Sequence, residues 1–260
     1  MYLRNVSYFH PHVAPFRHES QSADELLFIH GWTGTPAHLR PLARFVADAG
    51  HPVTAPLLAG HGTTELDMVQ TTWRDWVRTA GEAAQEILDR GHRLHLAGLS
   101  MGGIISLLLA PVFGASSVTT INAPIKVHNW QVRFSGFMRG SEKIRELPYD
   151  PPPNDDVAEF WQGYDDRPVG TVAELFDLVK AVRRNLDRVT APALIIQSHA
   201  DETVKAESAQ IIYDGISSQD KRLLWLERSR HVSTLDVERH IIGEAIVDHI
   251  ETSADTTAIS

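Results

Sequence analysis

The chain has 260 residues, 43% hydrophobic and 22% charged, so it can bury a sizeable core as one large α/β domain or two small ones. Its formal net charge of -9 argues against a nucleic-acid-binding protein, because a phosphate backbone is bound by clustered Lys and Arg. The chain has no cysteine, which excludes disulfides, thiolate metal sites and a cysteine nucleophile.

Short apolar runs bounded by Gly or Pro recur along the chain and predict buried strands. These runs cover residues 25–30, 51–56, 93–98, 117–122, 192–199 and 222–227. Helical patterns separate them, and this alternation is typical of a mostly parallel, doubly wound α/β sheet with crossover helices.

Two of the helices have clear signals at their ends. The segment Thr72–Asp75 fits a capping box, apolar residues then recur at helical spacing, and Gly91 supplies the stop. Near the C-terminus, Ser233 and Asp236 are predicted to open the last helix. Its apolar face is formed by Leu235, Ile242, Ile246 and Ile250.

The alternation breaks between residues 122 and 187, which contain no convincing strand. This segment is rich in aromatic residues, contains the triple proline 151–153, and closes with an amphipathic helix predicted to open at the capping box Thr171–Glu174. A linker would not carry so many aromatic residues. We therefore predict a core formed by residues 1–121 and 188–260, with residues 122–187 inserted as a cap packed over the sheet.

The segment HLAGLSMGGII, residues 95–105, contains the pattern Gly-x-Ser-x-Gly centred on Ser100. Three fixed positions arise often by chance, and the alternative is an ordinary serine in a strand-to-helix loop. A nucleophile elbow also requires a strand before the serine and a helix after it, and both are predicted here. Glycines at positions 98 and 102 leave room for the tight turn, so the position of the pattern favours Ser100 as a nucleophile.

A serine nucleophile needs a base and a carboxylate that orients the base. Asp201 lies just past one predicted strand, and His231 lies in the loop after the next. Glu202 is the alternative carboxylate, but the shorter side chain of Asp201 lies closer to the strand end. Because ligand and catalytic groups gather at the carboxyl edge of such a sheet, we expect Ser100, Asp201 and His231 to meet there.

A developing oxyanion requires preorganised donors, most often backbone N–H groups. The N–H of Met101, which follows the predicted nucleophile, is one candidate. The second is the N–H of Trp32 in the loop FIHGWTGTP, where Gly31 and Gly34 let the backbone curl toward the site. The alternative is that His30 and Gly31 only end a strand with a glycine turn.

Five segments in order, HGWTGTP, PLLAGHG, GLSMGG, HADETV and HVSTLD, resemble the α/β-hydrolase superfamily. More narrowly, they are similar to the bacterial carboxylesterases grouped with monoacylglycerol lipases, over nearly the whole chain from about Leu26 to Ile250. The resemblance implies an α/β-hydrolase fold with a small cap inserted after the sixth strand. It implies a nucleophile, a general base, an orienting acid and two oxyanion donors at Ser100, His231, Asp201, Trp32 and Met101.

The function expected from this resemblance is a serine carboxylesterase that forms an acyl-enzyme on Ser100, with no metal or organic cofactor. The apolar, aromatic insertion favours small-molecule esters of short to medium acyl chains, monoacylglycerols included. The same scaffold hosts lactonases, thioesterases, carbon–carbon hydrolases and small-ligand receptors that retain the triad, and these alternatives stay open. One departure from the family is Arg230, which stands before His231 where glycine is common and brings a cation near the site.

The N-terminal stretch MYLRNVSYFHPHVAPF has prolines and histidines where a signal peptide would have its apolar segment. No apolar run approaches the length of a membrane span. We therefore expect a cytoplasmic protein without integral membrane association or a nucleic-acid partner, acting as a monomer or weak homo-oligomer.

Overall fold

The computed structural model describes residues 10–127, 139–145 and 152–257. Parts of the predicted cap, including Pro151 of the triple proline, therefore lie outside the described residues. No helix within the described ranges is long and apolar enough to cross a membrane.

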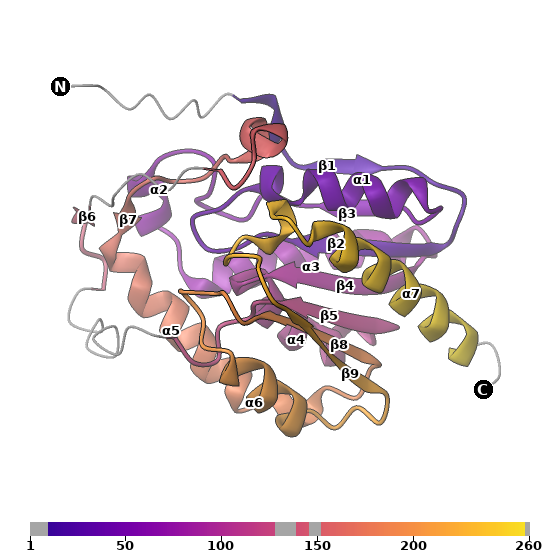
Figure 1. The fold of residues 1–260 in the computed structure, drawn as a ribbon. Helices are drawn as coiled ribbons and strands as arrows, with labels where there is room; N and C mark the ends of the chain where they lie inside the picture. The colour runs from indigo at the N-terminus through magenta and orange to yellow at the C-terminus, as the bar shows by residue number, and fades with distance from the viewer. Residues whose placement is uncertain (1–9, 128–138, 146–151, 258–260) are drawn as a thin grey trace.

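A seven-stranded sheet forms the centre of the molecule, in the order β1-β3-β2-β4-β5-β8-β9 (Figure 1). Its strands are β1 (Phe16–His18), β2 (Asp24–Ile29), β3 (Val53–Ala55), β4 (Arg93–Leu99), β5 (Ser117–Ile121), β8 (Ala193–Ser198) and β9 (Lys221–Leu226). All neighbouring pairs are parallel except β1 with β3, which are antiparallel. The predicted mostly parallel sheet is confirmed, and β1 is an edge strand that the apolar pattern missed.

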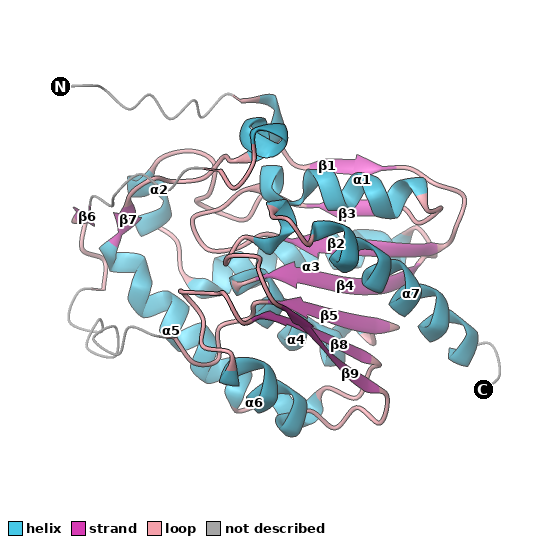
Figure 2. Cartoon of the chain, in the orientation of Figure 1, coloured by secondary structure: helices cyan, strands magenta, loops and turns pink. Residues whose placement is uncertain are grey.

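Helices cover both faces of this sheet (Figure 2). The helices of the described residues are α1 (Arg40–Asp48), α2 (Glu65–Val69), α3 (Trp73–Asp89), α4 (Met101–Phe113), α5 (Val169–Arg183), α6 (Glu207–Gly215) and α7 (Arg239–Thr257). Along β2, Leu27 and Ile29 join one buried cluster with α3, α4 and α5, while Leu26 and Phe28 join a second with α1 and α7. Because alternate side chains of a strand point to opposite faces, burial on both faces makes residues 26–29 a continuous apolar run.

The predicted start of α3 is confirmed, since the Thr72 N–H donates to Asp75 Oδ2 at 3.0 Å. The predicted start of α5 at the Thr171–Glu174 pattern is wrong, because the helix begins at Val169. The Thr171 hydroxyl donates to the Pro168 carbonyl instead of capping a helix end. The Thr171–Glu174 pattern therefore does not mark a helix start here.

The predicted start of the last helix is also wrong. Residues Ser233–Leu235 form a single 3-10 turn, and α7 begins only at Arg239. The Asp236 carboxylate accepts the N–H groups of Val237 and Arg230, which holds a loop in place before the helix. The predicted apolar face from Ile242 onward is buried as expected.

The segment between β5 and β8 contains α5 and a short antiparallel ladder of β6 (Ile144–Arg145) with β7 (Arg167–Pro168). The sequence showed no strand there, because two-residue strands leave no pattern. Counted along the described residues, β5 is the fifth strand, whereas the resemblance placed the cap after the sixth strand of the family pattern. Figure 1 shows α5 and the β6–β7 ladder beside the end of the sheet toward which the parallel strands run.

Candidate active site

Ser100 occupies the single residue between β4 and α4. Its backbone has φ 54° and ψ -119°, a conformation that costs a side-chain-bearing residue on the order of 1–3 kcal/mol. The turn is fixed by the Ser100 N–H, which donates to the Ile121 carbonyl at 2.7 Å. The Ser100 side chain is thereby presented on a strained, sharp turn at the carboxyl end of the sheet.

The glycines of the pattern are required by backbone contacts. A Cβ placed on Gly98 would lie 2.1 Å from the carbonyl carbon of Gly102, and one on Gly102 would lie 2.0 Å from the Ile29 carbonyl oxygen. Both distances are far below any tolerated contact. The elbow therefore closes only with hydrogen in place of a side chain at these two positions.

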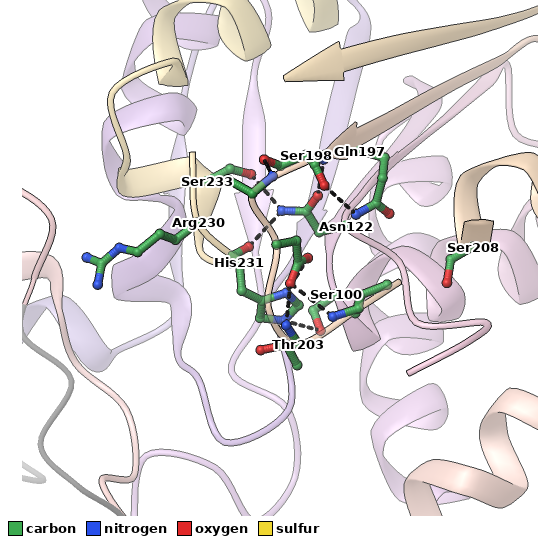
Figure 3. Close-up of polar contacts among 12 residues, drawn as sticks. Ser100, Asn122, Gln197, Ser198, Thr203, Ser208, Arg230, His231 and Ser233 are labelled. Atoms are coloured by element: carbon green, nitrogen blue, oxygen red, sulfur yellow. Dashed lines mark hydrogen bonds and ion pairs between the residues drawn. The ribbon is translucent and has the colours of Figure 1, made fainter. Parts of the chain in front are cut away.

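The predicted base His231 lies beside Ser100 (Figure 3), and Asp201 is hydrogen-bonded to His231. His231 Nε2 is 2.9 Å from Ser100 Oγ, and His231 Nδ1 is 2.8 Å from Asp201 Oδ2. Because a carboxylate only accepts, Nδ1 carries the imidazole proton and Nε2 is left free to accept the Ser100 proton. This is the tautomer that a general base requires.

Asp201 is buried and fixed from its other side. Its Oδ1 accepts the N–H groups of Thr203 at 2.8 Å and Val204 at 2.9 Å, which leaves Oδ2 for His231. The neighbouring Glu202, the alternative carboxylate, is exposed. The structure thus brings Asp201 to His231.

Asn122 is a functional position that the sequence analysis missed. It follows β5 directly, has φ 48°, and is fully buried. Its Nδ2 donates to the His231 carbonyl at 2.8 Å and to Ser233 Oγ at 3.1 Å, while its Oδ1 accepts the Ser198 N–H at 2.8 Å. One amide therefore joins the ends of β5 and β8 to the histidine loop (Figure 3). The available signal was an asparagine at a strand end, since Asn tolerates positive φ better than other residues.

A second buried carboxylate holds the approach to His231. Glu238 accepts the backbone N–H groups of Glu227, Arg228 and Ser229, together with the Ser229 hydroxyl. Burial opposes ionisation of Glu238, but the hydrogen bond from Ser229 and those from the backbone outweigh it and lower its pKa to about 2. The loop is thus anchored by an ionised group seven residues beyond the histidine.

Arg230, whose charge the sequence placed near the site, extends away from the His231 ring (Figure 3). Its Nε is 3.7 Å from Asp236 Oδ2, and its guanidinium lies 6.0 Å from the centre of the Trp161 ring. The cation is therefore directed toward Asp236 and Trp161.

The loop after β2 passes directly alongside the serine. A Cβ on Gly31 would lie 3.4 Å from Ser100 Cβ, and Trp32 is the next residue. His30 is fully buried and fixes this turn, because its Nε2 accepts the Leu58 N–H at 3.1 Å and its Nδ1 donates to the Gly31 carbonyl at 2.9 Å. Burial lowers the pKa of His30 well below its ordinary value, so the ring stays neutral in both roles.

Met101 is the first residue of α4. The first N–H groups of a helix have no acceptor within the helix and carry a partial positive charge, so they favour an anion. The Met101 N–H, directly after Ser100, and the Trp32 N–H, directly after Gly31, remain the two predicted oxyanion donors.

His38 is a further histidine near the site that the sequence analysis did not single out. Burial lowers its pKa to about 4, and the neighbouring His231 adds to this shift. Its ring centre lies 5.7 Å from that of Trp161, in the inserted segment. His38 thus joins the core to the inserted segment beside the histidine loop.

A second Ser–His–Asp set lies toward the amino ends of the central strands β2, β4 and β5, away from Ser100. His95 Nδ1 is 2.8 Å from Ser117 Oγ, and His95 Nε2 is 3.0 Å from Asp24 Oδ1. All three side chains are buried, with Ser117 only 1% exposed, and Ser117 begins an extended strand. Hydrogen-bond distances alone therefore do not define a site in this chain, because of these two serines only Ser100 combines them with a strained turn and a partly exposed side chain.

Across the described residues, no group of three or more His, Asp or Glu side chains is arranged to hold a metal ion.

A family model described as the alpha/beta hydrolase family matches residues 26–239, and the chain belongs to this family. The predicted recognition and the predicted α/β-hydrolase fold are confirmed.

Two relatives are similar to this chain over most of its length. The chain is 37% identical to a thermostable monoacylglycerol lipase of Bacillus sp. (strain H-257) over 222 residues, which is 84% of this chain and 87% of that one. It is 29% identical over 227 residues to a carboxylesterase of Bacillus subtilis (strain 168), covering 87% of this chain and 92% of that one.

Solved structures agree with these relatives. A structure described with LipS and LipT, two metagenome-derived lipolytic enzymes, superposes with a TM-score of 0.86 at 33% identity, covering 93% of this chain and 98% of that one. A monoacylglycerol lipase of Paleococcus ferrophilus has a TM-score of 0.75 at 17% identity, covering 90% of this chain and 98% of that one, and shows the shared fold alone.

Proposed function

We propose that this chain is a serine carboxylesterase that hydrolyses short- to medium-chain acyl esters, monoacylglycerols included, through an acyl-enzyme on Ser100. The observation that carries the proposal is the relay from Asp201 through His231 to Ser100, with distances of 2.8 and 2.9 Å, ending on a strained elbow. The similarity of the chain to a carboxylesterase and to a monoacylglycerol lipase supports ester hydrolysis as the reaction.

The relay supplies each proton transfer of a two-step hydrolysis. His231 Nε2 takes the hydroxyl proton as Ser100 Oγ bonds to the ester carbonyl carbon, and the carbonyl oxygen becomes an oxyanion. The N–H groups of Trp32 and Met101 stabilise that oxyanion. His231 then gives its proton to the alcohol oxygen as the ester bond breaks, which leaves the acyl group on Ser100.

Water completes the cycle by the same route. His231 takes a proton from the water as its oxygen bonds to the acyl carbon, and returns that proton to Ser100 Oγ as the carboxylic acid leaves. Asp201 keeps its carboxylate throughout and stabilises the imidazolium formed in each half of the reaction.

The inserted residues 122–187 act in this proposal as a cap that covers the carboxyl end of the sheet. The position of α5 and the β6–β7 ladder beside that end supports the assignment (Figure 1). The aromatic content of the insertion favours an uncharged acyl group over a charged one.

The test is hydrolysis of p-nitrophenyl esters of graded acyl length and of monoacylglycerols, compared with a thioester and a lactone. Ser100→Ala is expected to abolish turnover, whereas Ser217→Ala, at an exposed serine between α6 and β9, is expected to keep it. Preference for the lactone or thioester would replace the proposed substrate class. Tight binding of an apolar ligand without any turnover would contradict the enzyme and favour a receptor.

A further inference from the structure

The indole of Trp32 is hydrogen-bonded to the inserted segment. Trp32 Nε1 donates to Thr171 Oγ1 at 3.0 Å, across 139 residues of sequence. The proposed oxyanion donor is the backbone N–H of this same residue. The residue whose backbone N–H is the proposed oxyanion donor is therefore hydrogen-bonded to α5 through its side chain.

The polarity of this hydrogen bond is fixed. The Thr171 hydroxyl gives its own proton to the Pro168 carbonyl at 2.9 Å, so only a lone pair of Oγ1 faces the indole N–H. An indole nitrogen can only donate, and Thr171 is buried at 1% exposure. Loss of the hydroxyl would remove the acceptor of the Trp32 indole N–H.

The loop that carries Trp32 is itself strained. The Gly34 N–H donates to the Gly31 carbonyl at 3.1 Å, which closes a tight turn, and Thr33 inside that turn has φ 63°. Such a conformation persists at a non-glycine residue only when its surroundings fix it. The direction of the Trp32 N–H therefore depends on the hydrogen bonds that hold this loop, those of His30 and Thr33 and those from outside it.

Two further contacts from the inserted segment act on the same loop. The Tyr164 N–H donates to the Thr33 carbonyl at 2.8 Å, and Thr35 Oγ1 donates to the Gln162 carbonyl at 2.7 Å. Thr171 thus completes a set of three hydrogen bonds between the turn and residues 162–171.

Helix α5 also packs against α4, the helix that carries the second proposed donor. Leu178 and Val182 of α5 pack in one buried cluster with Ile104 and Ile105 of α4, the helix that begins at Met101. Glu174 of α5 accepts the Trp73 N–H at 3.2 Å, which ties α5 to α3 as well. One helix therefore contacts both elements that carry the oxyanion donors.

We propose that Thr171 is a positioning residue for ester hydrolysis, acting through the Trp32 indole to hold the Trp32 backbone N–H at the oxyanion position. This inference rests on the proposed function. It assigns α5 of the inserted segment a part in the rate of the chemical step, in addition to covering the site.

The test separates the hydroxyl from the volume of the side chain. Thr171→Val keeps the volume and removes the acceptor, and kcat for p-nitrophenyl butyrate is expected to fall roughly tenfold at nearly unchanged KM. Thr171→Ser keeps the hydroxyl and is expected to restore kcat to within about twofold of the parent. The matched control is Thr79→Val on α3, which is expected to leave kcat unchanged. The Thr79 hydroxyl likewise donates to a backbone carbonyl, that of Asp75.

Trp32→Phe tests the other end of the same hydrogen bond without altering α5. It is expected to lower kcat as Thr171→Val does, and the double variant should be no slower than the slower single variant. Unchanged kcat in Thr171→Val or in Trp32→Phe, a loss that Ser does not restore, or fully additive losses would each overturn the inference.

The proposed function is scored separately in the same assay. Turnover by the parent chain that disappears in Ser100→Ala supports that function, whatever Thr171→Val does. A parent chain without ester turnover would overturn the proposed function and this inference together.

Discussion

Truncation of Asn122 is expected to damage both stability and catalysis. Asn122→Gly removes three buried side-chain hydrogen bonds, at 2.8, 3.1 and 2.8 Å. At about 1 kcal/mol each, their loss lowers the free energy of unfolding by about 3 kcal/mol. Asn122→Ala adds roughly 1 kcal/mol, because alanine adopts the φ of 48° less readily than glycine.

The same truncation frees the His231 carbonyl from its anchor, so the imidazole is expected to lose its alignment with Ser100. A displacement of about 1 Å costs on the order of 100-fold in rate, so kcat should fall roughly 10- to 100-fold with little change in KM. Urea unfolding and steady-state ester hydrolysis measure the two effects. A loss of less than about 1 kcal/mol in Asn122→Gly with unchanged kcat would refute this role of the amide.

Three further outcomes are expected. Asp201→Asn should lower kcat by roughly 10⁴-fold because it imposes the wrong imidazole tautomer, while Glu202→Gln should leave kcat unchanged; equal losses in steady-state assays would contradict the assignment. Gly102→Ala should lose activity and unfold at lower urea, since its Cβ would lie 2.0 Å from a carbonyl oxygen of β2, and a normal urea midpoint would be inconsistent with that clash. Burial lowers the pKa of His61 and His249 to about 4 from 6.5, and Nε2 of each is buried without a hydrogen-bond partner among the described residues. Between pH 6.5 and 4, the unfolded chain therefore binds protons that the folded chain does not. The stability present above pH 6.5 is lost as the pH falls through that window, by about 3 kcal/mol for each ring. Equal urea midpoints at pH 7 and 4.5 would exclude this.

The strands that position the site were predictable because both faces of the sheet are covered. Strands β2, β4, β5 and β8 are buried along almost their whole length and are rich in apolar residues, and short apolar runs of this kind are a strand signal in a sequence. Catalytic candidates then follow from the ends of those strands. Ser100 was predicted from its Gly-x-Ser-x-Gly pattern at such a strand end, and Asp201 and His231 from their places just past two later strands.

Elements and contacts that depend on tertiary partners were not predictable. Strand β1 is only three half-buried residues at an edge, held in part by Arg17 Nε donating to the buried Glu25 at 2.9 Å. The pattern at Thr171 and Glu174 resembles a capping box, but their side chains serve Trp32 and Trp73 in other elements. Local pattern cannot reveal such partners, because they come from residues far away in sequence.

Asn122 lies between the features that the sequence could predict and those that it could not. Its type and its place after a strand indicated a left-handed backbone, but only the fold brings Ser198 and His231 within reach of its amide.

The most direct measurement is labelling of the intact chain with a fluorophosphonate, followed by mass analysis of the modified peptide. The chain carries a built-in comparison, because Ser117 is hydrogen-bonded to a His–Asp pair at distances similar to those of Ser100 but is buried. A single adduct is expected on Ser100, absent in Ser100→Ala and retained in Ser117→Ala. An adduct that survives Ser100→Ala, or that maps to Ser117, would contradict Ser100 as the nucleophile.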